Sequence, residues 1–330
     1  MTNTEHEFTE QLQGLLKEAY EEILAPYDME EFVELLAAGR MLRSRLALAT
    51  AGEPSTPLLE KCVALEMLHT STLVHDDIID KANMRRHYTT LSEGRGIEQA
   101  LMIGNILSSH ALLLASAALQ RHFIMTIDRI NIAQQTELHE RFRLTKTIAQ
   151  CIAAYSGKTS AMFELAIQVG HDTSPEHHTK PDKVIQAGHN LGIAFQLVDD
   201  AEDVESWLNR TIRNGRSKQA ESDIDLGNYT TPTIFAAQLA AKRLKRGLGD
   251  TDLERISHDE WIQGITHTRD IATNYINKTS EDIQIAQEDV ALNPLATRLG
   301  EWIAPLSKSL MGKSIDETLA VAHPAKRDTV

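Results

Sequence analysis

Apolar residues recur at helical spacing over most of the chain. Leu12, Leu16 and Tyr20 follow one another at intervals of four residues, and Met67 and Val74 are seven residues apart. Residues three, four and seven apart lie on one face of a helix, so the pattern predicts helices that pack against a common core. Strict alternation of apolar and polar residues never extends beyond a few positions, which argues against a chain built of strands.

Glycine, proline and polar residues interrupt this pattern at a few places, which we interpret as loops or tails: 52–57, 93–96, 170–181, 209–227 and 323–330. Most interruptions are short, as expected between antiparallel helices. The stretch 209–227 is long and polar and carries Arg213, Arg216 and Lys218, and long loops in compact domains often carry function. The sequence therefore predicts an all-α, single-domain bundle over residues 1–322, followed by a flexible tail at 323–330.

The charge balance restricts the possible partners of the chain. Lys and Arg number 33 against 47 Asp and Glu, giving a formal net charge of -14. A surface this acidic excludes nucleic acid as a partner of the bulk surface, so a polyanion site must be built locally from basic residues or bound metal. Cys62 and Cys151 match no metal-binding spacing and indicate reduced thiols. With no signal-like N-terminus and no long apolar run, we expect a cytoplasmic protein without stable membrane insertion.

Two aspartate patches carry the strongest chemical signal. The first, residues 75–80, follows an apolar helix and places Asp76 and Asp80 one helical turn apart on the same face. The second, residues 195–203, repeats the spacing with Asp199 and Asp203 and is expected to end another apolar helix. A single patch of this kind is usually a solvated helix end. Two copies, if their helices face each other, indicate carboxylates that converge on a divalent cation.

Mg²⁺ fits such a donor set, because it binds one or two carboxylates, retains water and completes its shell with phosphate oxygens. An acidic chain can bind a diphosphate in this way. Arginine forks and a lysine ammonium would supply further contacts. The alternative for these basic residues is a solvated helix face, or for the Arg85–Arg86 pair an ion pair with Glu93 or Glu98. The candidates are Arg40, Arg43, Arg85, Arg86, Lys158 and Thr159, together with the polar residues His69 and Gln196.

These motifs resemble those of the trans-isoprenyl diphosphate synthases, the polyprenyl synthetase family, and most closely its longer-chain members. The resemblance runs from about residue 35 to residue 235. It rests on the run 65–77 with Asp80, on Met84-Arg85-Arg86, on Gly157-Lys158-Thr159, and on the pattern 188–203 that ends in Asp199-Asp200-x-x-Asp203. The resemblance implies the isoprenoid synthase fold, in which helices surround a deep central cavity, and a homodimer.

The resemblance also implies a reaction and residue roles. Isopentenyl diphosphate condenses with an allylic diphosphate to give an all-trans polyprenyl diphosphate, and pyrophosphate leaves with the help of three Mg²⁺ ions. The implied metal ligands are Asp76, Asp80, Asp199 and Asp203, with Asp77 and Asp200 in support. The implied allylic diphosphate contacts are Arg85, Lys158, Thr159, Gln196 and Lys218, and the implied isopentenyl diphosphate contacts are Arg40, Arg43, His69 and Arg86. The implied catalytic group comprises the aspartates 76, 77, 80, 199 and 200 with Lys158.

Product length in this family depends on bulk just before the first aspartate motif. Short-chain members have aromatic rings four or five residues before its first aspartate, where this chain has Thr72 and Ser71. The resemblance therefore implies a deeper tunnel and a long product, with a floor among residues such as Ile103, Leu107, Ala111 or Leu114. Close helix packing also selects small residues, which is the alternative interpretation.

Several positions depart from the family pattern, among them Ser44 in place of a proline and Glu202 in place of an apolar residue. Met41 replaces a basic residue, His87 replaces a glycine after the arginine pair, and Asn228 replaces a lysine. These departures weaken the expected diphosphate sites but leave all six aspartates in place. Two alternatives to an active synthase stay open: a non-catalytic or regulatory subunit of a heteromeric synthase, and a class I terpene cyclase. The second aspartate motif argues against the cyclase.

Overall fold

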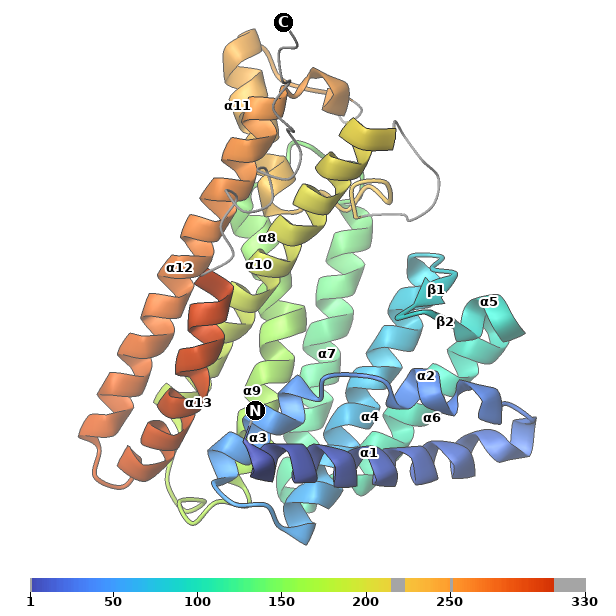
Figure 1. Ribbon diagram of the computed structural model, residues 1–330, viewed down its shortest axis with the longest axis vertical. Helices are drawn as coiled ribbons and strands as arrows, with labels where there is room; N and C mark the ends of the chain where they lie inside the picture. The colour runs from blue at the N-terminus through green and yellow to red at the C-terminus, as the bar shows by residue number, and fades with distance from the viewer. Residues whose placement is uncertain (1, 215–222, 250–251, 312–330) are drawn as a thin grey trace, which may run out of the picture. The chain divides into compact units, whose positions relative to one another are not determined.

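The computed structural model describes residues 2–214, 223–249 and 252–311. Secondary structure in these residues is almost entirely helical, and the sheet within them has two strands of two residues each (Figure 1). The predicted all-α fold class is therefore confirmed. Lys218 and the predicted tail at 323–330 lie outside the described residues.

The chain divides into two compact units. The first comprises Met1–His139, Ala153–Gly192 and Lys278–Gly300, and the second comprises Glu140–Ile152, Ile193–Asn277 and Glu301–Val330. The single domain over 1–322 stays a prediction.

The first unit holds the N-terminal helices and the hairpin. Its elements are α1 (Asn3–Leu24), two 3₁₀ turns (Ala25–Tyr27 and Glu30–Phe32), α2 (Val33–Ala37), α3 (Leu42–Ala51), α4 (Thr56–Ile79), β1 (Met84–Arg85), β2 (Tyr88–Thr89), α5 (Leu91–Arg95), α6 (Ile97–Leu114), α7 (Ala117–His139), a π-helical segment (Ser156–Ser160) and α9 (Ala161–His171). α4 packs against α6 and also contacts α1, α3 and α9, so it is the core helix of this unit.

Local sequence explains where α4 begins and ends. Ser55 accepts a hydrogen bond from the Leu58 amide and caps the helix, and a proline in the first turn suits its free N-terminal end. Residues 62–68 are all buried, so α4 is surrounded by neighbours over its middle turns. Asp80 closes the helix by donating its amide to the Asp76 carbonyl at 2.8 Å. The first aspartate patch therefore occupies the last helical turn, as predicted.

A tight hairpin follows α4 and carries the arginine pair. β1 and β2 pair antiparallel, with Arg85 opposite Tyr88. The two turn residues, Arg86 and His87, both have positive φ, 49° and 72°. Two-residue hairpins require this conformation, which glycine and asparagine adopt more readily than histidine.

Replacing His87 by glycine is expected to stabilise the protein. The left-handed conformation strains a residue with a Cβ, and glycine removes that strain at some cost in unfolded-state entropy, for a net gain of about 0.5–1 kcal/mol. Urea unfolding of the wild type and of His87→Gly measures the difference. His87→Ala, which keeps the Cβ, is the control and should show no gain. Equal unfolding midpoints for all three proteins would contradict the prediction.

Further helices contribute to the two units in different proportions. They are α8 (Ile148–Tyr155), α10 (Asp182–Asn214), α11 (Thr231–Leu244), a 3₁₀ turn (Asp252–Arg255), α12 (His258–Glu288) and α13 (Asn293–Met311). α11 and the 3₁₀ turn belong wholly to the second unit.

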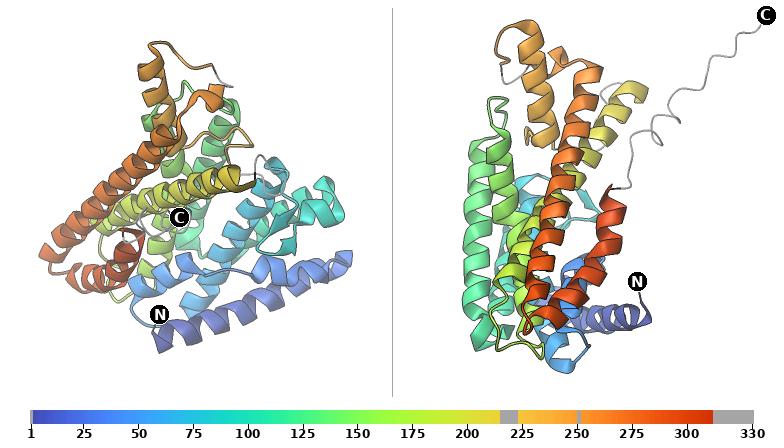
Figure 2. Two further views of the ribbon diagram at one scale, coloured as in Figure 1. Left: turned by 45° about the horizontal axis from the view of Figure 1, so that its top comes forward. Right: turned by 90° about the vertical axis from the view of Figure 1, so that its left-hand side faces the viewer.

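The second aspartate patch does not end its helix, contrary to the prediction. α10 continues without a break to Asn214 (Figure 2). Residues 209–214, which were predicted to begin a loop, are therefore helical. The buried residues Leu197, Ala201, Val204 and Leu208 follow one another at helical spacing through and beyond the patch. Their burial stabilises the helix and outweighs the repulsion between the aspartates.

The expectation that the chain has no long apolar run is wrong, whereas the expectation of no stable membrane insertion stays a prediction. α6 is long and apolar enough to cross a bilayer by length and composition, with a mean hydropathy of 1.2, and only 28% of it is buried. Short polar stretches interrupt its apolar run without lowering the mean hydropathy below that of a membrane segment. Length and composition do not distinguish such a helix from one that packs against another protein.

Candidate active site

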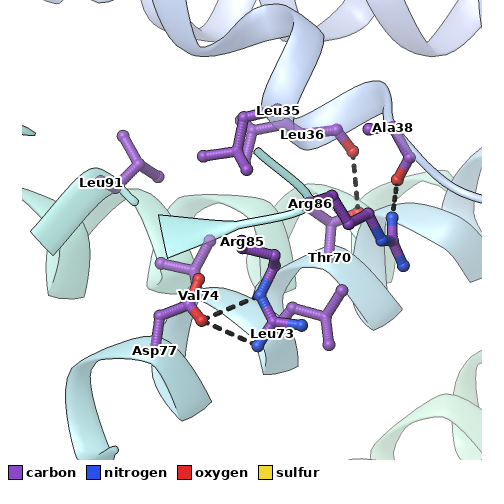
Figure 3. A pocket seen from close by; sticks show the side chains of 10 residues that line it. All are labelled: Leu35, Leu36, Ala38, Thr70, Leu73, Val74, Asp77, Arg85, Arg86 and Leu91. Carbon is purple, nitrogen blue, oxygen red and sulfur yellow. Dashed lines mark hydrogen bonds and ion pairs between the residues drawn. The ribbon is translucent and has the colours of Figure 1, made fainter. Parts of the chain in front are cut away.

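The first aspartate patch and the hairpin form one ion-paired group in the first unit. Arg85 donates from Nε and Nη2 to the same Asp77 oxygen, Oδ1, at 2.8 and 2.7 Å (Figure 3). Burial raises the pKa of Asp77, and the arginine opposes that rise. The alternative pairing of Arg85 with Glu93 or Glu98 is therefore not what the structure shows. Asp77 supports the hairpin that holds Arg85 beside the patch.

Asp76 lies in a strongly electrostatic setting. Burial raises the pKa of Asp76 to about 6, opposed by Lys158 and reinforced by Asp80 and Glu137. The Lys158 ammonium is 3.9 Å from Asp76 Oδ1. Although burial alone would lower the pKa of Lys158, the carboxylates around it raise it, so the ammonium stays charged. Because the pKa of Asp76 is raised, its ionised form is destabilised at this site, and an additional cation would stabilise that form.

Sequence reasoning missed two residues that hold Lys158. Its ammonium contacts Gln134 Oε1 at 2.5 Å and Glu137 Oε2 at 2.8 Å, both on α7. Their spacing of three residues on one helix face was the available signal. Such polar pairs are common on solvated helices, so the spacing alone does not single them out. Thr159 is the next residue in the same π-helical segment.

The predicted isopentenyl diphosphate residues converge in the first unit. Arg43 Nη1 lies 2.8 Å from His69 Nε2, and the pKa of His69 is lowered well below its usual value by burial and then by Arg43, Arg86 and Arg85. Burial also lowers the pKa of Arg86, with further contributions from Arg85 and Arg40. Arginines close enough to lower the pKa of His69 and of Arg86 create a strong local attraction for an anion.

A small pocket adjoins this basic cluster, which we define as Arg40, Arg43, His69, Arg85 and Arg86. Apolar side chains of α2 and α4 form one part of its wall, and Asp77, Arg85 and Arg86 form the polar part (Figure 3). Arg86 Nη1 donates to the Ala38 carbonyl, which anchors the guanidinium at the pocket. The lining residues are Leu35, Leu36, Ala38, Thr70, Leu73, Val74, Asp77, Arg85, Arg86 and Leu91.

The second aspartate motif belongs to the second unit. Asp199 is exposed, whereas Asp200 is buried and accepts a hydrogen bond from Gln196 Nε2 at 2.9 Å. Burial raises the pKa of Asp203, whose Oδ2 is buried without a hydrogen-bond partner. Asn228 stands where the family pattern has a lysine, and its Oδ1 accepts a hydrogen bond from Arg141 Nε at 3.1 Å.

The donors present fit a hard cation that keeps most of its water. Within the described residues, no group of three or more His, Cys, Asp or Glu side chains could hold a metal by itself. Mg²⁺ does not need such a group, since one or two carboxylates suffice when phosphate oxygens complete the shell. The raised pKa of Asp76 and the unpartnered oxygen of Asp203 both agree with carboxylates suited to a cation.

The predicted chain-length residues are small and internally hydrogen-bonded. Ser71 is 2% exposed, and its hydroxyl donates to the Leu68 carbonyl, while Thr72 donates to the His69 carbonyl. Neither hydroxyl therefore needs a polar partner from outside α4. Of the residues suggested for a tunnel floor, Ile103, Leu107 and Ala111 are buried, whereas Leu114 is half exposed.

These features define a helical protein with a cluster of basic side chains beside an aspartate-rich helix end. A model of the family named Polyprenyl synthetase matches residues 29–261, and the chain belongs to this family. That membership confirms the predicted family and the predicted class of enzyme, a trans-prenyltransferase.

Individual relatives agree with this assignment. The chain is 27% identical over 274 residues to a geranylgeranyl diphosphate synthase of Saccharolobus solfataricus, covering 75% of this chain and 80% of that protein. It is 29% identical over 240 residues to an all trans-polyprenyl-diphosphate synthase of Mus musculus, covering 68% of this chain and 56% of that protein. The chain therefore spans little more than half the length of the mouse relative.

Solved structures agree on the fold. A heptaprenyl diphosphate synthase from Staphylococcus aureus aligns with a TM-score of 0.73 at 20% identity, covering 94% of this chain and 98% of that one. A decaprenyl diphosphate synthase from Rhodobacter capsulatus aligns with a TM-score of 0.71 at 23% identity, covering 93% and 96%. At these identities the likeness establishes the isoprenoid synthase fold.

Proposed function

We propose that this protein is a Mg²⁺-dependent prenyltransferase that condenses isopentenyl diphosphate with an allylic diphosphate and releases pyrophosphate. The observation that carries the proposal is the basic cluster in the same unit as the Asp76–Lys158 pair, an anion site in a chain of net charge -14. The names of its relatives, which include geranylgeranyl and polyprenyl diphosphate synthases, support the same substrates.

The basic residues divide between two diphosphates in this proposal. Arg40, Arg43, His69 and Arg86 bind isopentenyl diphosphate, with His69 neutral because its pKa is low. Arg85, Lys158, Thr159, Gln196 and Lys218 bind the allylic diphosphate. Fixed charges at the departing pyrophosphate stabilise the transition state, and positioning of the two substrates supplies much of the remaining rate.

The aspartates would hold the metal ions. Asp76, Asp80, Asp199 and Asp203 are the proposed ligands, with Asp77 and Asp200 in support. When bound, Mg²⁺ supplies charge neutralisation at the leaving pyrophosphate. Asp77 orients Arg85, and Lys158 keeps its positive charge beside Asp76.

The small residues Ser71 and Thr72 support a long product. A growing chain requires apolar space below the reacting carbon, and neither position carries an aromatic ring that would close it. We propose a long-chain all-trans polyprenyl diphosphate. Met41 is buried, so it offers nothing to a diphosphate in place of the family's basic residue, which predicts a weakened isopentenyl diphosphate site.

Product analysis tests the proposal. Purified protein, Mg²⁺ and labelled isopentenyl diphosphate are incubated with geranyl or farnesyl diphosphate, and the product length is measured by chromatography. A long polyprenyl diphosphate supports the full proposal. A short product would support a prenyl diphosphate synthase but reject the proposed long product. No product from either starter would favour the non-catalytic subunit, which the buried Met41 also allows.

We further propose a cytoplasmic homodimer, with the dimer surface on α6 and α7. Exposed apolar side chains are concentrated on these helices, and large exposed apolar patches are typical of subunit interfaces. They are Ile97, Leu101, Met102, Leu113, Leu114, Ile124, Met125, Ile132 and Leu138. A dimer also explains why α6 resembles a membrane helix in composition. The buried thiols Cys62 and Cys151 agree with a reducing compartment.

Glutamates on this surface should dissociate the dimer. Met125 and Ile132 are seven residues apart on one exposed face of α7, so Met125→Glu with Ile132→Glu places two charges in the interface. Sedimentation should show a dimer for the wild type and a monomer for the variant. Val290→Glu, at an exposed apolar residue elsewhere in the first unit, is the control and should remain dimeric. A variant that sediments with the wild type would reject this interface.

A further inference from the structure

Lys158 lies on an irregular segment of helix. The residues Ser156–Ser160 form a π-helical turn, wider than the α-helix that continues from Ala161. A π turn changes the regular backbone hydrogen bonding and is less stable than an α turn, so the surrounding side chains must hold it. Any shift in this turn moves the ammonium that we propose contacts the allylic diphosphate.

We propose that Arg129 and Glu164 are positioning residues that hold the π-helical segment and thereby aim the Lys158 ammonium at the allylic diphosphate. This inference rests on the proposed function of Lys158. Arg129 and Glu164 act through the backbone of the segment and belong to neither of the substrate-binding groups defined above.

The ion pair joins α7 to the segment at its beginning. Arg129 donates from Nη1 and Nη2 to the two Glu164 oxygens at 2.6 and 2.9 Å. Its Nη2 also donates to the Ser156 carbonyl at 2.8 Å, the first residue of the π turn. A planar guanidinium makes such contacts simultaneously, whereas an ammonium cannot reproduce their geometry.

The same carboxylate also contacts α10. Glu164 Oε1 lies 2.7 Å from His189 Nδ1, and the Ser160 hydroxyl donates to the His189 carbonyl at 2.9 Å. Burial alone would raise the pKa of Glu164, but the hydrogen bonds from His189 and Arg129 outweigh it and lower that pKa. Glu164 is therefore ionised at neutral pH and links three elements of the first unit.

Two glycines show how closely the segment is clamped. A Cβ on Gly157 would lie 2.6 Å from the Ala133 Cβ of α7, and a Cβ on Gly192 would lie 2.6 Å from the Ser160 Cα. The segment therefore cannot move closer to α7 or to α10 at these points without a rearrangement. Because α7 also carries Gln134 and Glu137, one helix holds both the backbone of the turn and the ammonium of Lys158. The network therefore controls where the ammonium points.

Glu164→Gln tests the proposal, because it preserves the shape of the side chain and removes its charge. The expected result is a 10- to 100-fold loss in kcat/KM for the allylic diphosphate, with KM for isopentenyl diphosphate within twofold of the wild type. In a Lys158→Ala background the same substitution should cost less than twofold, since the residue it positions is gone. An equal loss in both backgrounds would overturn the proposal.

A matched control separates positioning from the general loss of a part-buried ion pair. Arg298 and Glu176 have side chains 28% and 11% exposed, against 35% and 15% for Arg129 and Glu164, and lie in the same unit. Glu176→Gln should leave kcat/KM for the allylic diphosphate within twofold. A loss equal to that of Glu164→Gln would reject a specific role for the Arg129–Glu164 pair.

A second variant tests the geometry of the ion pair, and a binding assay provides a test that does not depend on turnover. Arg129→Lys keeps the positive charge, but its ammonium cannot contact Glu164 and Ser156 together. We therefore expect it to lose activity as Glu164→Gln does. Full activity of Arg129→Lys would reject the proposal. If the wild type forms no product, the proposed function fails. Calorimetry with inorganic pyrophosphate and Mg²⁺ then decides the positioning role: weaker binding by Glu164→Gln, but not by Glu176→Gln, supports it, and equal binding rejects it.

Discussion

Asp76→Asn should lower turnover by on the order of 10³-fold or more while making the metal-free protein more stable above pH 6. The loss of turnover follows from removing a proposed Mg²⁺ ligand at the departing pyrophosphate. The gain in stability follows from the pKa of Asp76, which burial raises from 3.8 to about 6. A neutral amide avoids the cost of an ionised carboxylate at this site.

The pH dependence has a definite sign. The folded protein binds the Asp76 proton more tightly than the unfolded chain does, so this group stabilises the fold below pH 3.8. That contribution is lost as the pH rises through about 6. At 1.36 kcal/mol per pKa unit, the metal-free wild type should lose about 1–3 kcal/mol across this window, and Asp76→Asn should not.

Chemical unfolding at pH 5 and pH 8, with and without Mg²⁺ and pyrophosphate, measures both effects. The ligands should stabilise the wild type but not Asp76→Asn. Asp172→Asn is a matched control, because Asp172 is 26% exposed and paired with Lys61, against 27% for Asp76 paired with Lys158. The control should retain turnover. Full turnover by Asp76→Asn would show that Asp76 is not a metal ligand.

Ser71→Phe should shorten the product by several isoprene units. Ser71 is buried on α4, five residues before Asp76, and α6 packs against this helix. A phenyl ring there occupies apolar space that the growing chain would otherwise enter. Because the Ser71 hydroxyl is satisfied within α4, its removal leaves no partner on a neighbouring helix unpaired.

Chromatography of the products at matched substrate ratios measures the shift. A larger side chain in a filled core costs about 1–3 kcal/mol, so thermal unfolding must accompany the assay. Ser71→Ala, which adds no bulk, is the control and should give the wild-type product. A stable Ser71→Phe protein that makes the wild-type product would place Ser71 away from the tunnel.

Local patterns predicted the first aspartate motif correctly because its geometry is local. A capped apolar helix carries Asp76 and Asp80 at a fixed spacing, and its last turn ends at the motif. The end of α10 was predicted wrongly, since a charged patch suggests a solvated end. Burial of Val204 and Leu208 instead keeps the helix intact. Tertiary packing therefore decided that boundary.

Contacts across distant parts of the chain were not predictable from spacing. Gln134 and Glu137 hold Lys158 from more than twenty positions earlier, and nothing in the local pattern of α7 marks them. Arg85 was expected either to bind substrate or to pair with a neighbouring glutamate, and it pairs with Asp77. Which of several carboxylates an arginine meets depends on how a hairpin folds back on its helix.

The sequence by itself determined the helical class, the family and the identity of the charged residues, because periodicity and motif spacing are properties of the linear chain. Only the tertiary structure decided their physical state. It buries Asp76 and raises its pKa, gathers cations around His69 and lowers its pKa, and joins the π turn that carries Lys158 to Arg129, which is paired with Glu164. Burial and charge proximity act through space, so the folded arrangement sets them.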